Sequence, residues 1–348
     1  MTQGNNIRVL DPFGGDQWNH LVSAHPGGTF FHSSNWARVL QQSYAHQPHY
    51  LAEMTGETPR ALLPILEVNS SWTGRRGVSL PFSDDCALLR FGNANGSRLI
   101  DHALNIGRER GWKYLEFRGE IEGDPTPLSW KSYLGHEIDL TVGVNALFDG
   151  LESRVRRAIR KAEKAGLTTR LLDDLEATQV FYGLHCRTRR KHGVPPQPFF
   201  FFQHLCEHVL RVGKGFIIAA EHNGKVVAAS VFVHYGRSAI YKFGASDPSS
   251  LGLRPNTLVM WEAIKWYSTN GYSTFSMGRT APGNEGLRFF KCGFGAKETP
   301  INYYRYNFDR KTFVAGNDEK VSMVNKFLTV APLPVLRIIG RVLYPHLD

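Results

Sequence analysis

The chain has 348 residues, of which 42 % are hydrophobic and 21 % charged, a composition that describes a globular protein and excludes a disordered one. Its formal net charge of +10 favours a nucleic acid, a phosphorylated substrate or an anionic membrane surface as partner, although a generally basic surface gives the same number. No apolar run reaches the roughly 18 residues that span a bilayer, and the start of the chain shows no basic-then-apolar signal.

The four cysteines form no CxxC pair and no metal-ligand spacing. This usage is typical of reduced, mostly buried thiols in a cytosolic protein. We therefore expect a cytoplasmic location.

The first half of the chain alternates between strand and helix patterns. Ser34 is a candidate N-cap for a helix that ends near Tyr44, and Gly111 is expected to end a helix over 97–110. Strands are predicted in this half by apolar alternation over 49–54, 60–68, 78–82, 112–118 and 136–140.

The second half repeats this order. One register aligns Ala52-Glu53, Gly56 and Ala61 with Ala220-Glu221, Gly224 and Ala229. A second register aligns Ala103, Gly111 and Trp112 with Ala263, Gly271 and Tyr272. Both halves read as strand, turn, strand, helix, glycine, aromatic residue and strand. Two registers in one order predict a duplicated α/β domain. We expect domains over 1–145 and 171–312, a basic connecting helix over 146–170, and an amphipathic tail over 313–348.

The connecting helix carries a narrow apolar stripe of Val155, Ile159 and Ala162. Cations cover the rest of its surface, and only two glutamates offset them. A solvated helix face is one interpretation; the other is a binding surface for an anion, because self-repulsion would otherwise destabilise the helix. The cations in question include Arg156, Arg157, Arg160, Lys161 and Lys164.

The tail places Val335, Ile338, Ile339 and Val342 on one helix face, beside the pair Arg337 and Arg341. Two interpretations stay open. The helix packs on the body of the protein, or residues 333–344 form a basic interfacial helix that lies on anionic lipid.

The candidate site lies between Pro255 and Gly295, which read as helix, strand, tight turn and second helix. Gly278-Arg279-Thr280 follows the strand, where α/β proteins tend to place ligand-contacting groups. Glu285 opens the second helix, which also carries Arg288 and Lys291. Such a cluster of charges around glycines points to a site.

Familiar catalytic motifs are missing, because the chain has no GxSxG, HExxH, P-loop or GxGxxG after a strand. The 14 histidines show no ligand spacing, so we expect no metal. The remaining possibility is catalysis by electrostatic stabilisation and by positioning of the substrates.

Four segments resemble the FemAB-like family of the GNAT (acyl-CoA N-acyltransferase) superfamily, and the resemblance runs from about Pro26 to Tyr306. The segments are PGGTFFHSSNWARVL, VSLPFSDD, LESRVRRAIRKAEKAGL and, most specific, PNTLVMWEAIKW with GYSTFSMGRTAPGNEGLRFFKCGFGAKE. The resemblance implies an α/β (α+β) fold of two tandem GNAT-like domains, each a mixed, mostly antiparallel sheet flanked by helices. It also implies N-acyl or aminoacyl transfer. The best-known members use aminoacyl-tRNA to extend the peptide of a cell-wall precursor, and others are associated with exopolysaccharide or protein-export systems.

Acyl transfer to an amine needs charge for a large anionic donor and an oxyanion, and a group that removes a proton. Arg279 and Lys291 are candidates for the charge, and Glu285 for the base or orienter of the amine. Asn256 is a further candidate, which caps a helix or binds substrate. Tyr241 and Lys242 are expected at the opening of the acyl groove. Asp84 and Asp85 meet an amino acceptor or form a turn.

One stretch departs from the pyrophosphate loop that is typical of CoA-binding GNAT proteins. Residues 249–256 keep one glycine and Arg254, but Pro255 lacks a backbone N–H. This favours a donor held elsewhere, such as tRNA against the basic helix, over acyl-CoA. We expect no permanently bound cofactor.

The leading hypothesis is therefore transfer of an aminoacyl or acyl group to an amine on an envelope or exopolysaccharide precursor, in the cytoplasm or at the inner face of the membrane. An acyl-CoA-dependent N-acetyltransferase and a non-catalytic tRNA- or membrane-binding protein are the alternatives.

Overall fold

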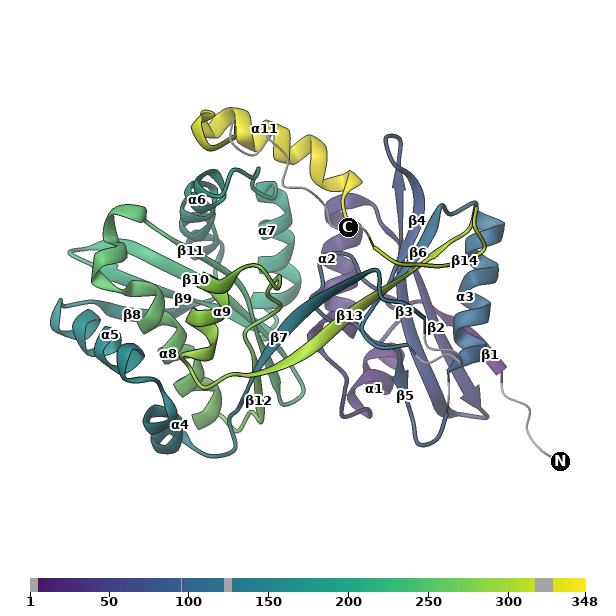
Figure 1. Ribbon diagram of the computed structural model, residues 1–348, viewed down its shortest axis with the longest axis horizontal. Coiled ribbons are helices and arrows are strands. Elements are labelled where there is room, and N and C mark those ends of the chain that lie inside the picture. The colour runs from purple at the N-terminus through teal and green to yellow at the C-terminus, as the bar shows by residue number, and fades with distance from the viewer. Residues whose placement is uncertain (1–5, 95, 122–126, 317–327) are drawn as a thin grey trace. The chain divides into compact units, whose positions relative to one another are not determined.

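The computed structural model of the chain describes residues 6–94, 96–121, 127–316 and 328–348. These form two compact units (Figure 1). Unit 1 takes its residues from Met1–Tyr133, Pro300–Glu319 and Leu343–Asp348, and unit 2 from Leu134–Thr299 and Lys320–Val342. Each unit is a mixed, mostly antiparallel sheet flanked by helices, which confirms the expected fold class.

The sheet of unit 2 has six strands in the order β7-β12-β11-β10-β9-β8. Their bounds are β7 (Lys131–Asp139), β8 (Thr168–Leu172), β9 (Gly215–His222), β10 (Lys225–Tyr235), β11 (Ser238–Ser246) and β12 (Thr274–Ser276). Neighbours are antiparallel except β11 and β12, which run parallel. The β9–β10 turn has positive φ at Asn223 and Gly224, as the Asn-Gly pair predicts.

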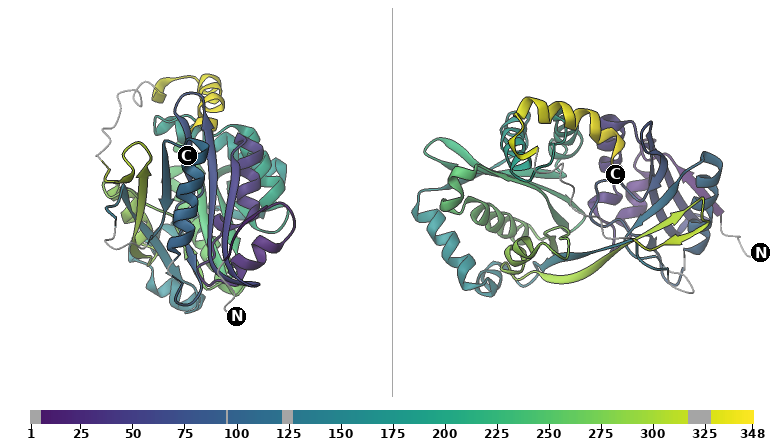
Figure 2. Two further views of the ribbon diagram at one scale, coloured as in Figure 1. Left: turned by 90° about the vertical axis from the view of Figure 1, so that its right-hand side faces the viewer. Right: turned by 45° about the horizontal axis from the view of Figure 1, so that its top comes forward.

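Two layers of helices cover this sheet (Figures 1 and 2). The helices are α4 (Val144–Gly150), α5 (Ser153–Lys164), α6 (Leu175–Lys191), α7 (Phe199–Leu205), α8 (Pro255–Thr269) and α9 (Glu285–Cys292). On one face, α5 and α8 share a core with Phe216 and Ile218 of β9. Ile217 and Ala219 alternate with these residues and face α6 on the other side. The stripe Val155, Ile159 and Ala162 is buried, as the sequence predicts.

Unit 1 repeats the same plan with the strand order β1-β2-β3-β4-β6-β13. Its strands are β1 (Asn6–Leu10), β2 (Gln47–Thr55), β3 (Thr58–Ser70), β4 (Gly74–Val78), β6 (Tyr114–Arg118) and β13 (Lys297–Asn307), with β5 (Leu89–Arg90) on β3 and β14 (Thr312–Val314) on β13. Here β4 and β6 are the parallel pair. Its helices are α1 (Gln17–Ser23), α2 (Ser34–Tyr44) and α3 (Ser97–Arg110).

The two strand orders confirm the internal duplication and add an exchange of strands. β7 follows β6 in the sequence but pairs with β12 in unit 2, with Ile138 opposite Phe275. β13 follows the strands of unit 2 but pairs with β6 in unit 1, with Tyr306 opposite Leu115. Each sheet is therefore completed by a strand from the other half of the chain.

Two local predictions are wrong. The cap of α2 is Ser33, whose hydroxyl accepts from the Trp36 N–H, and Ser34 is already the first helical residue. The strand expected over 78–82 ends at Val78, because positive φ values at Leu80 and Phe82 are incompatible with extended backbone. The helix end at Gly111 is confirmed, with a φ of 67°.

Among the described residues, none of the helices combines the length and apolar composition that a membrane crossing requires.

Candidate functional site

A cavity of about 280 Å³ opens in unit 2 beside the place where β11 and β12 part. The two strands pair over Ser238–Ile240 and Thr274–Ser276; β12 then ends, whereas β11 continues to Ser246. The cavity is lined by the end of α6, by β11, by a 3₁₀ turn over Pro248–Leu253, and by α8 and α9. The lining residues are Thr188, Lys191, His192, Tyr241, Gly244, Ala245, Ser246, Pro248, Leu251, Asn256, Leu287 and Phe290.

Tyr241 is a proton donor on the wall of this cavity. Burial raises the pKa of its phenol to about 12, and a hydrogen bond with Ser230 opposes that shift. The hydroxyl therefore stays protonated at neutral pH. It rests against Gly244, where an added Cβ would overlap the Tyr241 hydroxyl. A residue without a Cβ at position 244 thus leaves the space that the Tyr241 phenol occupies.

His192 is a proton acceptor on the same wall. It follows the last residue of α6, and its backbone N–H donates to the Thr188 carbonyl at 3.2 Å. His192 is exposed, and partial desolvation, followed by the charges of Lys191 and Arg189, lowers the pKa of its imidazole. The ring is therefore neutral at pH 7. One cavity thus carries a neutral imidazole and a protonated phenol, the forms in which a general base and a general acid act.

The first turn of α8 contributes the third polar element. Asn256 donates from Nδ2 to the Ser246 hydroxyl at 3.1 Å and lines the cavity. Arg254, which is exposed, precedes the helix with a φ of 65°, and Pro255 is the first helical residue. The N-terminal end of this 15-residue helix carries partial positive charge, which stabilises an anionic group in the cavity.

Two of the three residues that the sequence proposed for catalysis, Lys291 and Glu285, occupy different environments. Lys291 is buried, and its ammonium donates to the carbonyls of Gly278 at 2.7 Å and Arg279 at 3.0 Å. Glu285 is 74 % exposed and lies 3.9 Å from Arg288. Of the described residues that line the cavity, none is Arg279, Glu285 or Lys291. Lys291 thus holds the turn after β12.

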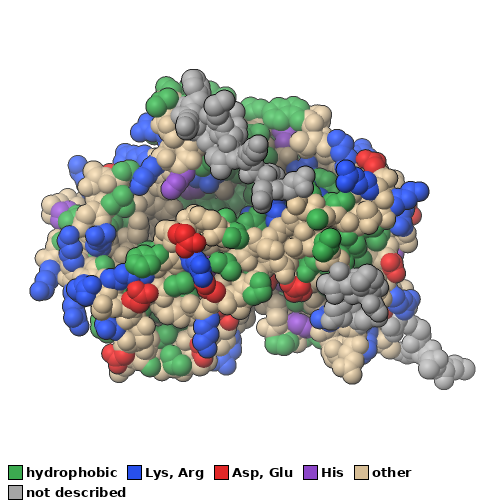
Figure 3. Space-filling view, viewed as in Figure 1, with side chains coloured by type: hydrophobic (Ala, Val, Ile, Leu, Met, Phe, Trp, Pro, Cys, Tyr) green, Lys and Arg blue, Asp and Glu red, His purple; other side chains and the backbone are tan. Residues whose placement is uncertain are grey.

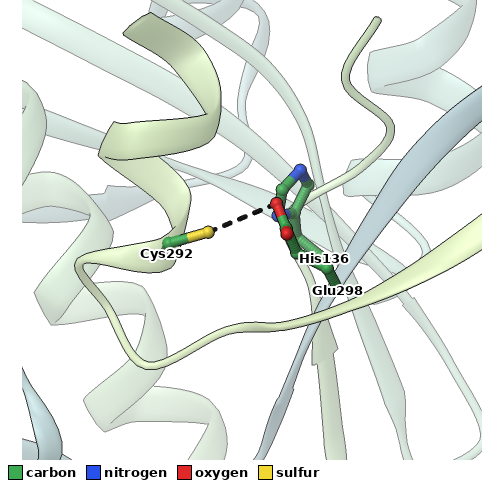
Figure 4. A group of neighbouring side chains, drawn as sticks. All are labelled: His136, Cys292 and Glu298. Atoms are coloured by element: carbon green, nitrogen blue, oxygen red, sulfur yellow. Dashed lines mark hydrogen bonds and ion pairs between the residues drawn. The ribbon is translucent and has the colours of Figure 1, made fainter. Parts of the chain in front are cut away.

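A second polar cluster joins α9 to β13 and β7 (Figure 4). Arg288 donates from Nε and Nη2 to the two oxygens of Glu298 at 2.7 and 2.8 Å, which holds the pKa of that carboxyl at about 2. The Cys292 thiol donates to Glu298 at 3.4 Å, and burial and this carboxylate raise the thiol's pKa. His136 is buried, with Nδ1 3.7 Å from Glu298 Oε1.

The ligand atoms of His136, Cys292 and Glu298 all lie within 4.8 Å of one another, a set that zinc accepts. However, Arg288 already engages both oxygens of Glu298, and the positive charge of Lys291 helps to lower the pKa of His136. A dication would have to displace the Arg288 guanidinium from Glu298 and would be repelled by the Lys291 charge that already acts on His136. We therefore assign no metal to this cluster.

Some cations of the basic helix α5 pack against unit 2, and others are exposed. Arg154 lies on the Phe289 ring, and Arg156 donates to the carbonyls of Asp149 and Leu151, so both serve the packing of unit 2. The side chains of four further cations are exposed: Arg157, Arg160, Lys161 and Lys164. In Figure 3, Lys and Arg side chains gather over this helix at the left edge.

Asp84 and Asp85 belong to unit 1. The Tyr303 hydroxyl donates to the Asp84 carbonyl at 2.7 Å. Burial, followed by the charges of Asp84 and Glu120, raises the pKa of Asp85 to about 6. In unit 2, the Lys242 ammonium lies 5.4 Å from the centroid of the Phe243 ring. Of the substrate-binding candidates, Tyr241 and Asn256 are thus the two that line the cavity.

The sequence did not single out His192 as a catalytic residue. It ends a basic run on α6 and belongs to no motif, and β11 and α8 lie about 50 residues or more further along the chain.

Substitution of Gly244 tests the packing around the phenol. We expect Gly244→Ala to lower the free energy of unfolding by about 1–3 kcal/mol, because the new methyl group displaces a buried ring. Gly183→Ala, on α6, is the control: its Cβ meets nothing within 4 Å, and alanine favours a helix by about 0.5–1 kcal/mol. Urea denaturation of both variants measures the difference, and equal stabilities would contradict the assignment.

Comparison with known proteins places this cavity in a GNAT fold. Residues 151–291 match the family described as the acetyltransferase (GNAT) domain. No curated protein sequence matches the chain at a significant level. Among solved structures, FemX is similar with a TM-score of 0.71 and 13 % identity, covering 88 % of this chain and 98 % of FemX.

Two further structures share the fold. L-PGS from Bacillus licheniformis has a TM-score of 0.56 and 15 % identity, covering 96 % of this chain and 99 % of its own. A tandem GNAT protein from the clavulanic acid biosynthesis pathway has a TM-score of 0.55 and 12 % identity, covering 91 % and 100 %. The chain therefore shares the fold of these structures, and residues 151–291 carry the match to the acetyltransferase (GNAT) domain.

Proposed function

We propose that this acyltransferase moves an aminoacyl or acyl group to an amine acceptor on a cell-envelope or exopolysaccharide precursor, and that the cavity of unit 2 is where it does so. The observation that carries the proposal is the pair on the cavity wall, with His192 kept neutral and Tyr241 kept protonated. The similarity of the fold to FemX and to L-PGS supports aminoacyl transfer in particular.

The chemistry follows from the placement of these groups. His192 takes a proton from the attacking ammonium, and the freed amine forms a C–N bond with the donor carbonyl. The tetrahedral intermediate carries a negative oxygen, which the first turn of α8 and the Asn256 amide stabilise. When the intermediate collapses, the carbonyl's bond to the leaving oxygen or sulfur breaks, and the Tyr241 hydroxyl gives its proton to that atom. The nitrogen passes its remaining extra proton to the Tyr241 phenolate, which restores the phenol, and His192 releases its proton to water. The products are an amide and a free donor alcohol or thiol.

Two features favour aminoacyl-tRNA as the donor. Pro255 removes a backbone N–H from the helix start that would hold a pyrophosphate. The exposed cations of α5, Arg157, Arg160, Lys161 and Lys164, form a surface that suits a polyanion. Acyl-CoA is the second candidate donor, because the matched family is described as acetyltransferases. The cytoplasm, or the inner face of a membrane, is where either donor would be met.

A binding titration separates the two donors. The purified chain is titrated with mixed aminoacyl-tRNA and, separately, with acetyl-CoA at two salt concentrations. We expect tRNA to bind with a steep salt dependence, since each neutralised phosphate contributes a slope between about −0.7 on a single strand and about −0.9 on a duplex. Replacing Arg157 and Arg160 by Gln should reduce this slope by about 1 to 2.

The matched control is Arg187→Gln, a cation on α6 that pairs with Asp247 at 3.2 Å. It should leave the slope unchanged. Tight binding of acetyl-CoA, with tRNA binding that the α5 variants do not alter, would reject tRNA as the donor and assign the enzyme to acyl-CoA.

A further inference from the structure

Helix α11 (Leu333–Leu343) of the tail is held to unit 2 by one of its faces. Leu336 and Gly340 are buried, and a Cβ added at Gly340 would overlap the Pro196 carbonyl. The guanidinium of Arg337 lies 5.3 Å from the centroid of the Tyr182 ring on α6. Figure 1 shows α11 in yellow lying over α6 and α7. The tail is thus a packed element of the protein, one of the two arrangements that the sequence leaves open.

The opposite face of the same helix is apolar and exposed. Val335, Ile338 and Val342, here called the apolar stripe, are 46, 65 and 50 % exposed. Their spacing of three and four residues puts them in one row along the helix. Val330, just before the helix, is 77 % exposed. Apolar side chains that expose half of their surface in a row, on a helix already held by its other face, indicate a binding surface.

The charges beside the stripe define what it binds. Arg337 and Arg341 are exposed on the same helix, and the described residues 328–343 contain no aspartate or glutamate. If two copies of the chain met through their stripes, these arginines would face each other without a carboxylate partner. A bilayer with an apolar interior and anionic headgroups satisfies both features, because the valines and the isoleucine enter the acyl chains while the Arg341 guanidinium meets phosphate.

We propose that the apolar stripe of α11 binds the surface of an anionic lipid bilayer and so makes this protein a peripheral membrane protein. The helix lies flat on the headgroups with Val335, Ile338 and Val342 inserted. Arg341 supplies the electrostatic part of the attraction, which falls as the salt concentration rises.

Vesicle sedimentation of the full-length chain tests this proposal. One vesicle preparation contains phosphatidylcholine alone, and the other contains phosphatidylcholine mixed with phosphatidylglycerol. We expect at least tenfold stronger partitioning onto the phosphatidylglycerol vesicles. Ile338→Glu should abolish binding to both, and Arg341→Gln should weaken binding to the anionic vesicles alone.

Val142→Glu is the matched control, because Val142 is 55 % exposed and lies in unit 2 just before α4. It should bind like the unaltered chain. Because Ile338 is exposed, thermal unfolding of Ile338→Glu should occur at the unaltered temperature, which separates lost binding from lost folding. Vesicle binding that survives Ile338→Glu, or a dimer in solution that this substitution dissolves, would overturn the proposal.

Discussion

Acidification from about pH 6 to about pH 5 is expected to lower the free energy of unfolding steeply. His32, His46 and His185 are buried, and burial lowers their pKa values to about 4, 4 and 3, against an ordinary value of 6.5. Near pH 5 the unfolded chain therefore binds almost three more protons at these positions than the folded chain. Stability rises with pH wherever the unfolded state binds more protons, so it falls on acidification.

The size of the effect follows from the proton count. Three protons correspond to about 4 kcal/mol per pH unit. Asp85 acts in the opposite direction, since its raised pKa of about 6 makes the folded state hold a proton that the unfolded state has lost. These four groups together contribute a slope of about 2.5 kcal/mol per pH unit.

Urea denaturation across this pH range measures that slope. His185→Gln should reduce it by about 1.3 kcal/mol per pH unit, because one proton is removed from the balance. The exposed His20 on α1 offers the control, since its replacement by Gln changes no buried group. A stability that stays level between pH 6 and pH 5 would show that these rings titrate normally.

Removal of either group of the proposed acid–base pair should lower kcat by about 10²- to 10⁴-fold. The two variants should differ in their pH profiles. Activity of the unaltered enzyme falls on the acid side as His192 takes up a proton, at a pH below 6.5 because its pKa is lowered. His192→Gln should flatten that acid limb. Tyr241→Phe should keep it, because the histidine is unchanged.

The comparison with Glu285 decides between two bases. Glu285 is exposed and pairs only loosely with Arg288, so Glu285→Gln should change kcat by less than about twofold. The assay follows transfer of a labelled aminoacyl or acyl group to an amine acceptor. If Glu285→Gln lost as much activity as His192→Gln, the carboxylate that the sequence suggested would share the role of base.

Much of the fold could be predicted because its signals are local. Gly111 ends α3 by adopting the left-handed conformation, and the Asn223-Gly224 pair closes the β9–β10 hairpin with two positive φ values. The internal repeat likewise predicted two sheets of one design. These features depend on residues that are close in sequence, or on a pattern that occurs twice.

The candidate site could be predicted only in part, because it depends on contacts between distant segments. Tyr241 and Asn256 line the cavity, but so does His192, which α6 brings there from another part of the chain. Lys291 looks like a catalytic cation in sequence; in the structure its ammonium is bound to the carbonyls of Gly278 and Arg279. A sequence pattern shows which charges are near in the chain, not which way each side chain turns.

The exchanged strands have a consequence for synthesis of the protein. When β6 leaves the ribosome at Arg118, its antiparallel neighbour β13 lies beyond residue 296 and has not yet been made. Unit 1 must therefore wait with an open sheet edge, which is an aggregation hazard. All six strands of the unit 2 sheet have been synthesised once β12 ends at Ser276, before β13 begins at Lys297, so that sheet can form first. We expect the N-terminal half to be the last part of the nascent chain to become resistant to protease, the reverse of the usual order.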